Sequence, residues 1–138
     1  MKKYELIEHT ADIGIRAYGA DYKELFVNCA RAMFEIIADL EGLKISVSVP
    51  VKLKAADFEG LLVSWLDELL YNCYTKGIIF CDFDIKELTS TNIVAAASGR
   101  HIGDNKNRLK AEIKAATFHD LKIKKDKDCY SVEIIFDV

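Results

Sequence analysis

Two stretches of this sequence place apolar residues at helical spacing, while most of the remaining apolar residues alternate with polar ones. The first helical stretch begins at Asp21 and runs to Ile37; the second begins at Asp57 and ends before Gly77. Apolar residues that recur every three or four positions form one buried stripe on a helix. A chain with only two such stripes must bury them against a sheet, and this requirement constrains the fold most.

The helix ends are marked by capping residues. Asp21 is followed three residues later by Glu24, which resembles a capping box, and Asp57 is an equivalent cap for the second helix. Gly42 and Gly77 are typical stop residues. The first stripe consists of Leu25, Phe26, Cys29, Ala30, Met33, Phe34 and Ile37; the second consists of Leu61, Leu62, Trp65, Leu66, Leu69, Leu70, Cys73 and Tyr74.

The strands are grouped rather than alternating with the helices. This order favours a single α+β domain over residues 1–138, with two layers and two amphipathic helices packed on one face of a mixed or antiparallel sheet. Pro50 lies in an alternating run and indicates an edge strand. Residues 103–108 form a polar loop, and residues 125–128 make a turn. The predicted strands are 3–8, 13–19, 44–55, 78–88, 92–101, 109–116, 121–125 and 130–136.

Charge and cysteine content limit the functional classes. The formal net charge is -3, which argues against strong direct binding of nucleic acid, since phosphate contacts require clustered Lys and Arg. Cys29 and Cys73 fall on the apolar stripes and are expected in the core, as in a protein of the reducing cytoplasm. Because the first residues lead at once into a predicted strand, we expect neither a signal peptide nor a membrane-spanning run. One basic cluster is interpreted as a solvated edge, with an RNA- or partner-facing patch as the alternative: Lys122, Lys124, Lys125 and Lys127.

The sequence contains no nucleophile motif, P-loop or dinucleotide fingerprint. The polar cluster at residues 8–12, which ends in Asp12, is either a structural turn or a carboxylate held on a stiff hairpin. At the other end of the sequence, Asp137 is followed by the terminal carboxylate of Val138. Two such negative groups repel each other unless a cation lies beside them. A hard divalent ion or the side chain of Lys114 would supply that charge.

A third candidate lies at residues 109–119. Alternation places Lys110, Glu112 and Lys114 on one face of a strand that leads to His119. This face is either a solvent face with ion pairs of little energetic value or a functional charged stripe.

Four segments together resemble the archease family: residues 8–19, 58–71, 110–119 and 135–138. They occur in the family's order and span the chain. Ala116 and Phe118 depart from the family pattern, where valine and tyrosine are expected, but the charged positions are intact.

The resemblance implies an accessory protein, not an enzyme, that helps a GTP-dependent tRNA-splicing RNA ligase to load guanylate and to turn over repeatedly. It implies a divalent ion, calcium in the family, held by Asp12, Asp137 and the terminal carboxylate of Val138. The residues expected to act on the partner are Lys114, His9, Glu112 and His119. A chaperone-like modulator of a tRNA methyltransferase is the alternative, and a hydrolase that uses the metal and His119 is a third interpretation.

Overall fold

The computed structural model describes residues 2–8, 12–117 and 121–138. Two long helices and eight strands follow one another in a mixed order. The strands are β1 (Tyr4–Glu8), β2 (Ile13–Gly19), β3 (Val47–Lys54), β4 (Ile78–Leu88), β5 (Asn92–His101), β6 (Ala115–Ala116), β7 (Lys124–Asp126) and β8 (Cys129–Asp137). The helices are α1 (Tyr22–Ile37), α2 (Phe58–Lys76) and the 3-10 helix η1 (Gly103–Arg108).

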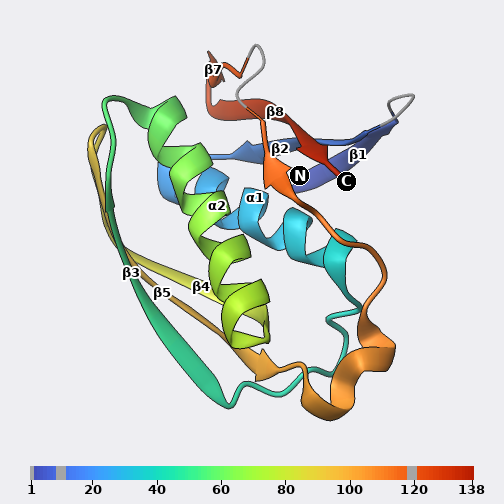
Figure 1. Cartoon of the computed structure of the whole chain (residues 1–138). Coiled ribbons are helices and arrows are strands. Elements are labelled where there is room, and N and C mark those ends of the chain that lie inside the picture. The colour runs from blue at the N-terminus through green and yellow to red at the C-terminus, as the bar shows by residue number, and fades with distance from the viewer. Residues whose placement is uncertain (1, 9–11, 118–120) are drawn as a thin grey trace.

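The strands form two antiparallel sheets with α1 and α2 between them (Figure 1). One sheet has the order β1-β2-β8-β6, with β7 also paired to β8, and the other has the order β3-β5-β4. The predicted α+β class is confirmed. The structure has two sheets where the sequence led us to expect one, because alternation identifies a strand but not its partner. Pro50 lies in β3, which is an edge strand as predicted.

Both predicted helix starts are confirmed. The Asp21 carboxylate accepts the N–H of Glu24 at 2.8 Å, and the Asp57 carboxylate accepts the N–H of Gly60 at 2.7 Å. These bonds satisfy N–H groups that have no partner within the helix. At the end of α2, Gly77 has a φ of 65°, a left-handed conformation that glycine adopts without strain.

Gly42, the stop residue predicted for the first helix, does not end it: α1 ends at Ile37, the last residue of the predicted apolar stripe and five residues before Gly42. The carbonyl oxygen of Ile37 accepts the N–H of Lys110 at 2.7 Å, and the N–H of Asp39 bonds to Arg108 at 2.8 Å. A distant segment therefore supplies the partners of the last helical turn, so that no glycine cap is needed.

One hydrophobic core joins the helices to both sheets. The indole N–H of Trp65 in α2 donates to the carbonyl oxygen of Phe26 in α1 at 3.1 Å, so even the polar atom of this buried ring has a partner. Cys29 and Cys73 are buried, as predicted. Burying a large apolar side chain stabilises a fold by about 2 kcal/mol. The largest fully buried side chains include Trp65, Phe26, Phe34, Phe80 and Phe136.

Several predicted boundaries need correction in the second half of the chain. The predicted strand at 109–116 is reduced to Ala115–Ala116, and the predicted loop at 103–108 is the 3-10 helix η1. The strand predicted at 44–55 begins only at Val47. The final turn is formed by Lys127 and Asp128 between β7 and β8.

Among the helices that the structure describes, none has the length and apolar character needed to cross a bilayer.

Candidate functional site

Asp12 and Asp137 lie at the same end of two neighbouring strands. Ile13 of β2 and Phe136 of β8 are cross-strand partners. Asp12 directly precedes Ile13, and Asp137 directly follows Phe136. Residues opposite each other on antiparallel strands have Cβ atoms about 5 Å apart. Continued by one residue, the antiparallel pairing places Asp12 opposite Asp137, which come from opposite ends of the sequence.

Lys114 and Val138 lie at the same end of the sheet. Ala115 pairs with Asp137 on the other side of β8, and the N–H of Lys114 donates to the carbonyl oxygen of Asp137 at 2.7 Å. Lys114 therefore enters β6 where Val138 leaves β8. Both Lys114 and Asp137 are exposed, while Asp12 is half-buried. The main chains of Asp12, Lys114, Asp137 and Val138 lie at this one end of the sheet, and we call this region the acidic end.

Two side chains of α2 hold the segment that carries Lys114. The Tyr74 hydroxyl donates to the carbonyl oxygen of Ile113 at 2.7 Å and accepts the N–H of the same residue at 2.9 Å. The carboxylate of Asp67, two turns earlier on α2, accepts the N–H of Ala116 at 3.1 Å. These contacts fix the main chain on both sides of Lys114.

Burial changes the acidity of both anchoring groups. Desolvation raises the pKa of Asp67 above its usual range, and the Ala116 N–H partly offsets this effect because it favours the charged carboxylate. Desolvation also raises the pKa of the Tyr74 hydroxyl. The sequence did not identify either residue as functional. Tyr74 was assigned to the apolar stripe, yet its side chain is 45% exposed.

The donor chemistry of the acidic end fits a hard divalent cation. Carboxylate oxygens are the ligands that calcium prefers, and two carboxylates on adjoining strands repel each other unless a positive charge lies between them. In the part of the chain that the structure describes, three or more Asp, Glu, His or Cys side chains do not gather at metal-binding distance.

The remaining predicted residues divide into two groups. Glu112 is exposed and lines a shallow hollow beside Tyr74 and Leu109. His9 and His119 lie outside the described residues.

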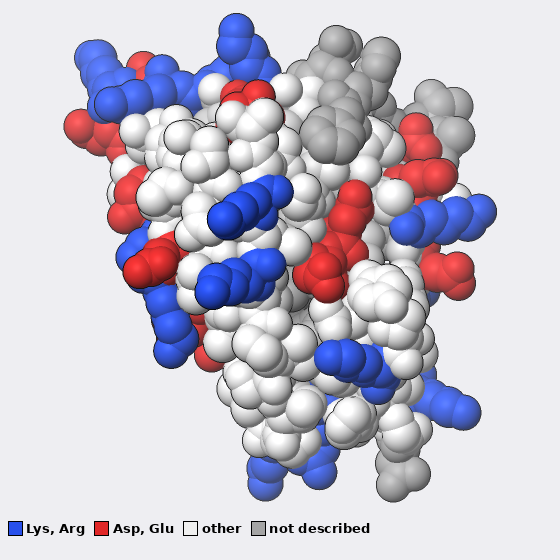
Figure 2. Space-filling model, turned by 60° about the vertical axis from the view of Figure 1, so that its left-hand side comes forward, with Lys and Arg blue, Asp and Glu red and all other residues white. Residues whose placement is uncertain are grey.

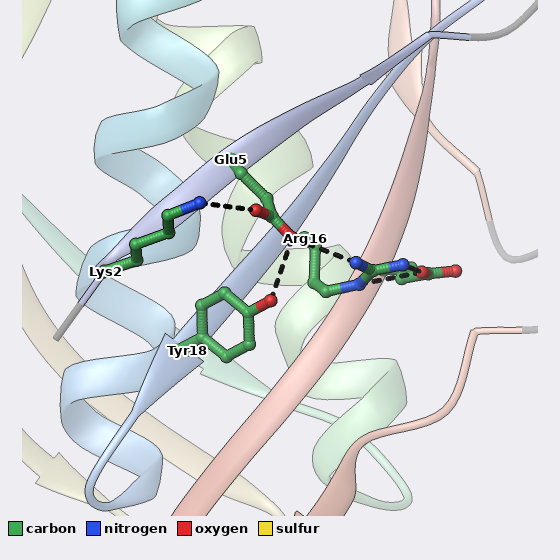
Figure 3. A network of polar contacts seen from close by, with 5 residues as sticks. Lys2, Glu5, Arg16 and Tyr18 are labelled. Atoms are coloured by element: carbon green, nitrogen blue, oxygen red, sulfur yellow. Dashed lines mark hydrogen bonds and ion pairs between the residues drawn. The ribbon is translucent and has the colours of Figure 1, made fainter.

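The outer face of the five-stranded sheet carries a polar network around Arg16 (Figure 3). The Arg16 guanidinium in β2 bonds to Glu5 of β1 at 2.9 Å and to Glu133 of β8. Glu5 also accepts the hydroxyl of Tyr18 at 2.9 Å and the ammonium of Lys2 at 3.3 Å. The Tyr18, Lys2 and Arg16 bonds lower the pKa of Glu5. The network joins β1, β2 and β8 on the face away from the helices, which supports the register that aligns Asp12 with Asp137.

Comparison with known families identifies the class of protein. The sequence profile described as the Archease protein family (MTH1598/TM1083) matches residues 4–138. The chain belongs to the archease family.

Its relatives match over nearly their whole length. The protein archease of Methanosarcina acetivorans is 38% identical over 141 residues, which cover 99% of this chain and 97% of the relative. The protein archease of Sulfurisphaera tokodaii is 35% identical, with complete coverage of both chains.

Two solved structures share the fold. The solution structure of Methanobacterium thermoautotrophicum protein 1598 has a TM-score of 0.80 and 32% identity, and covers both chains completely. The crystal structure of a Thermotoga maritima protein, described as an archease and possible chaperone, has a TM-score of 0.63 and 26% identity over 96% of this chain and 94% of that one.

Proposed function

We propose that this protein is a non-enzymatic activator of a GTP-dependent tRNA-splicing RNA ligase in the cytoplasm, and that the acidic end acts on the ligase. The observation that carries the proposal is the alignment of Asp12 and Asp137 on neighbouring strands. Membership of the archease family supports it, because the family resemblance implies help with guanylate loading and with multiple turnover.

The acidic end would hold one divalent ion, with calcium as the first candidate. Asp12, Asp137 and the main-chain carboxylate that Val138 carries in this sequence would supply the oxygen ligands. When bound, the ion supplies positive charge that offsets the carboxylates and accepts further oxygen ligands. Because β2 and β8 are paired as far as Ile13 and Phe136, the residues next to these, Asp12 and Asp137, would need little rearrangement to bind the ion.

Lys114 would act as the neighbouring cation that contacts the ligase. Its main-chain N–H is bonded to Asp137, and its segment is fastened to α2. His9, Glu112 and His119 complete the proposed contact set. To activate the ligase, this surface must bind the guanylate-accepting state of the ligase more tightly than its other states. Equal affinity for all states would leave the equilibrium between them unchanged.

The test is multiple-turnover ligation by a purified GTP-dependent RNA ligase, with and without this protein. We expect Asp12→Asn and Asp137→Asn to abolish the stimulation of guanylylation and turnover while the circular dichroism spectrum is unchanged. Asp82→Asn is the matched control, because Asp82 is an exposed aspartate on β4 in the other sheet. If both acidic-end variants stimulate as well as the control, the proposal is wrong.

A chaperone-like modulator of a tRNA methyltransferase is the second candidate. It is favoured by the description of the similar Thermotoga maritima protein as a possible chaperone. In that case the helices or sheet faces would bind the client rather than the acidic end. Capture of a purified methyltransferase that persists in the Asp12→Asn variant would support this candidate over the ligase activator.

A further inference from the structure

A second charged region lies at the other end of β8 from Asp137. Lys122, Lys124, Lys125 and Lys127 precede β8 or form the β7–β8 turn, and all four are exposed. We call residues 122–130 the lysine hairpin. Eight residue steps along β8 separate Cys129 from Asp137, which corresponds to roughly 27 Å in an extended strand. Figure 2 shows lysine and arginine side chains at the end of the molecule where Figure 1 places β7.

The lysine hairpin is fastened to the start of both long helices. The ring of Tyr130 lies 4.4 Å from that of Tyr22, which stacks on Phe58 with centroids 3.7 Å apart. The Glu59 carboxylate accepts the N–H of Ile123 at 3.2 Å. The Lys125 ammonium lies 5.5 Å from the centre of the Tyr130 ring. Lysines that merely protect a sheet edge from aggregation need no such anchor, whereas a recognition surface benefits from a fixed position.

A hollow of about 210 Å³ lies at the base of the hairpin on the outer sheet face. Lys122 and Lys124 line it together with Ser131 and the Arg16–Glu133 pair. Arg16 is bonded to Glu133 and Glu5, so its charge is largely offset. Among the described residues, neither Lys122 nor Lys124 forms an ion pair. The hollow thus has two uncompensated ammonium groups and a hydroxyl donor, which is the chemistry that binds a phosphate group.

We propose that the lysine hairpin binds the phosphate backbone of an RNA strand. The inference rests on the proposed function in one respect: the RNA would be the strand that the ligase joins. Lys122 lies two residues before the start of β7 at Lys124, and such a separation spans up to about 7 Å between Cα atoms in an extended chain. That spacing is comparable to the distance between successive phosphates of an extended strand.

The side chains around the hairpin favour RNA over an acidic protein. Protein interfaces have a desolvated centre that is rich in aromatic and apolar side chains. The exposed large apolar side chains of the described residues all lie elsewhere. The hairpin instead offers charge without an apolar centre, which suits a ligand held through its backbone.

The expected affinity is low and dependent on salt. Each lysine–phosphate contact with a single strand contributes about 0.7 to the slope of log affinity against log salt. The net charge of -3 opposes RNA binding by the protein as a whole. The hairpin therefore steadies RNA that the ligase already holds, and it does not capture RNA on its own at physiological salt.

The test compares a variant of the hairpin with a charge-matched control. Lys122→Gln/Lys124→Gln removes the two cations of the hollow, and Lys52→Gln/Lys54→Gln removes two exposed cations from β3 in the other sheet. Fluorescence anisotropy with a labelled single-stranded RNA at low salt is the direct readout. We expect the hairpin variant to bind at least five-fold more weakly, with a salt slope lower by about 1.4, and the control to bind like the parent. Equal binding by the two variants would overturn the inference.

A second readout separates this inference from the proposed function. In ligation assays, we expect the hairpin variant to stimulate guanylylation of the ligase without RNA as well as the parent does, but to raise the KM for RNA. Failure of the parent to stimulate guanylylation would count against the proposed function, and the anisotropy result would still decide the RNA contact. If the hairpin variant instead loses binding to the ligase in the absence of RNA, the hairpin is a protein interface and the RNA assignment is wrong.

Discussion

The hydroxyl of Tyr74 closes a two-bond contact with a single residue, Ile113: it donates to the carbonyl oxygen at 2.7 Å and accepts the N–H at 2.9 Å. Residue 113 is followed by Lys114, whose N–H bonds to Asp137. One side chain of α2 therefore sets the path by which β6 approaches the acidic end.

We expect removal of the Tyr74 hydroxyl to lower the stability of the fold. Tyr74→Phe leaves the ring in place but deprives the N–H and carbonyl oxygen of Ile113 of their partner. Because Tyr74 is partly exposed, water can replace some of the loss, and we expect the free energy of unfolding to fall by about 1–2 kcal/mol. Urea denaturation measures this change. Tyr71→Phe is the control, because the Tyr71 side chain is 62% exposed; an equal loss in both variants would show that the Tyr74 contact is not the cause.

Asp67 provides a prediction about pH. Its folded-state pKa is raised by desolvation, so the folded protein binds this proton more tightly than the unfolded chain does. The contribution of Asp67 to stability is present below the unfolded pKa and is lost as pH rises through the folded pKa. Asp67→Asn keeps an oxygen that can accept the Ala116 N–H but does not titrate. We expect this variant to lose less stability than the parent as pH rises through the range just above the ordinary aspartate pKa.

Denaturation midpoints at several pH values measure this difference. Asp67→Ala is the comparison, because it removes both the charge and the acceptor, and it should be less stable than Asp67→Asn at every pH. If stability changes with pH in the same way in the parent and in Asp67→Asn, the pKa of Asp67 is not raised in the folded protein.

The cysteines should divide into two classes of reactivity. Cys29 and Cys73 are buried, which raises the pKa of Cys73 to about 12 and raises that of Cys29 as well; Cys81, whose pKa burial also raises, and Cys129 are only half-buried and remain accessible to a reagent. Since the thiolate is the reactive form, we expect two thiols per chain to react with Ellman's reagent in the native protein and four after denaturation. Rapid reaction of all four native thiols would contradict the predicted burial.

Most of the helix ends were predictable because the residues that cap them lie close to those ends in the sequence. Asp21, Asp57 and Gly77 mark ends that depend on neighbouring residues, and the structure places the caps at these positions. The end of α1 was missed because its partners are Arg108 and Lys110, about 70 residues away. No periodic pattern near Gly42 reports that contact.

The predicted strand at 109–116 failed for a related reason. Its residues alternate as a strand requires, but Lys110 and Ala111 bond to Ile37, and Ile113 bonds to a tyrosine side chain. Alternation indicates a backbone able to extend, while the available partners decide whether a ladder forms. The roles of Asp67 and Tyr74 were not predicted either, since on a helical pattern Asp67 looks like a polar surface position and Tyr74 looks like part of the buried apolar stripe.

The residues of the candidate site come from the sequence, and their common position in the fold comes from the structure. The sequence and its family resemblance named Asp12, Asp137, Val138 and Lys114. Their meeting depends on β8 pairing with β2 on one side and β6 on the other. Those pairings join the two ends of the sequence, and they follow from the core, which buries Ile15, Ile134 and Phe136 on the inner face.

We expect the carboxylates of Asp12, just before β2, and of Asp137, at the end of β8, to share one divalent cation, and calorimetric titration with calcium measures this binding. We predict one calcium bound per chain in the parent, an affinity at least ten-fold weaker in Asp12→Asn and in Asp137→Asn, and an unchanged affinity in Asp82→Asn. Parent-like calcium binding in both acidic-end variants, or no calcium binding in the parent, would contradict the account.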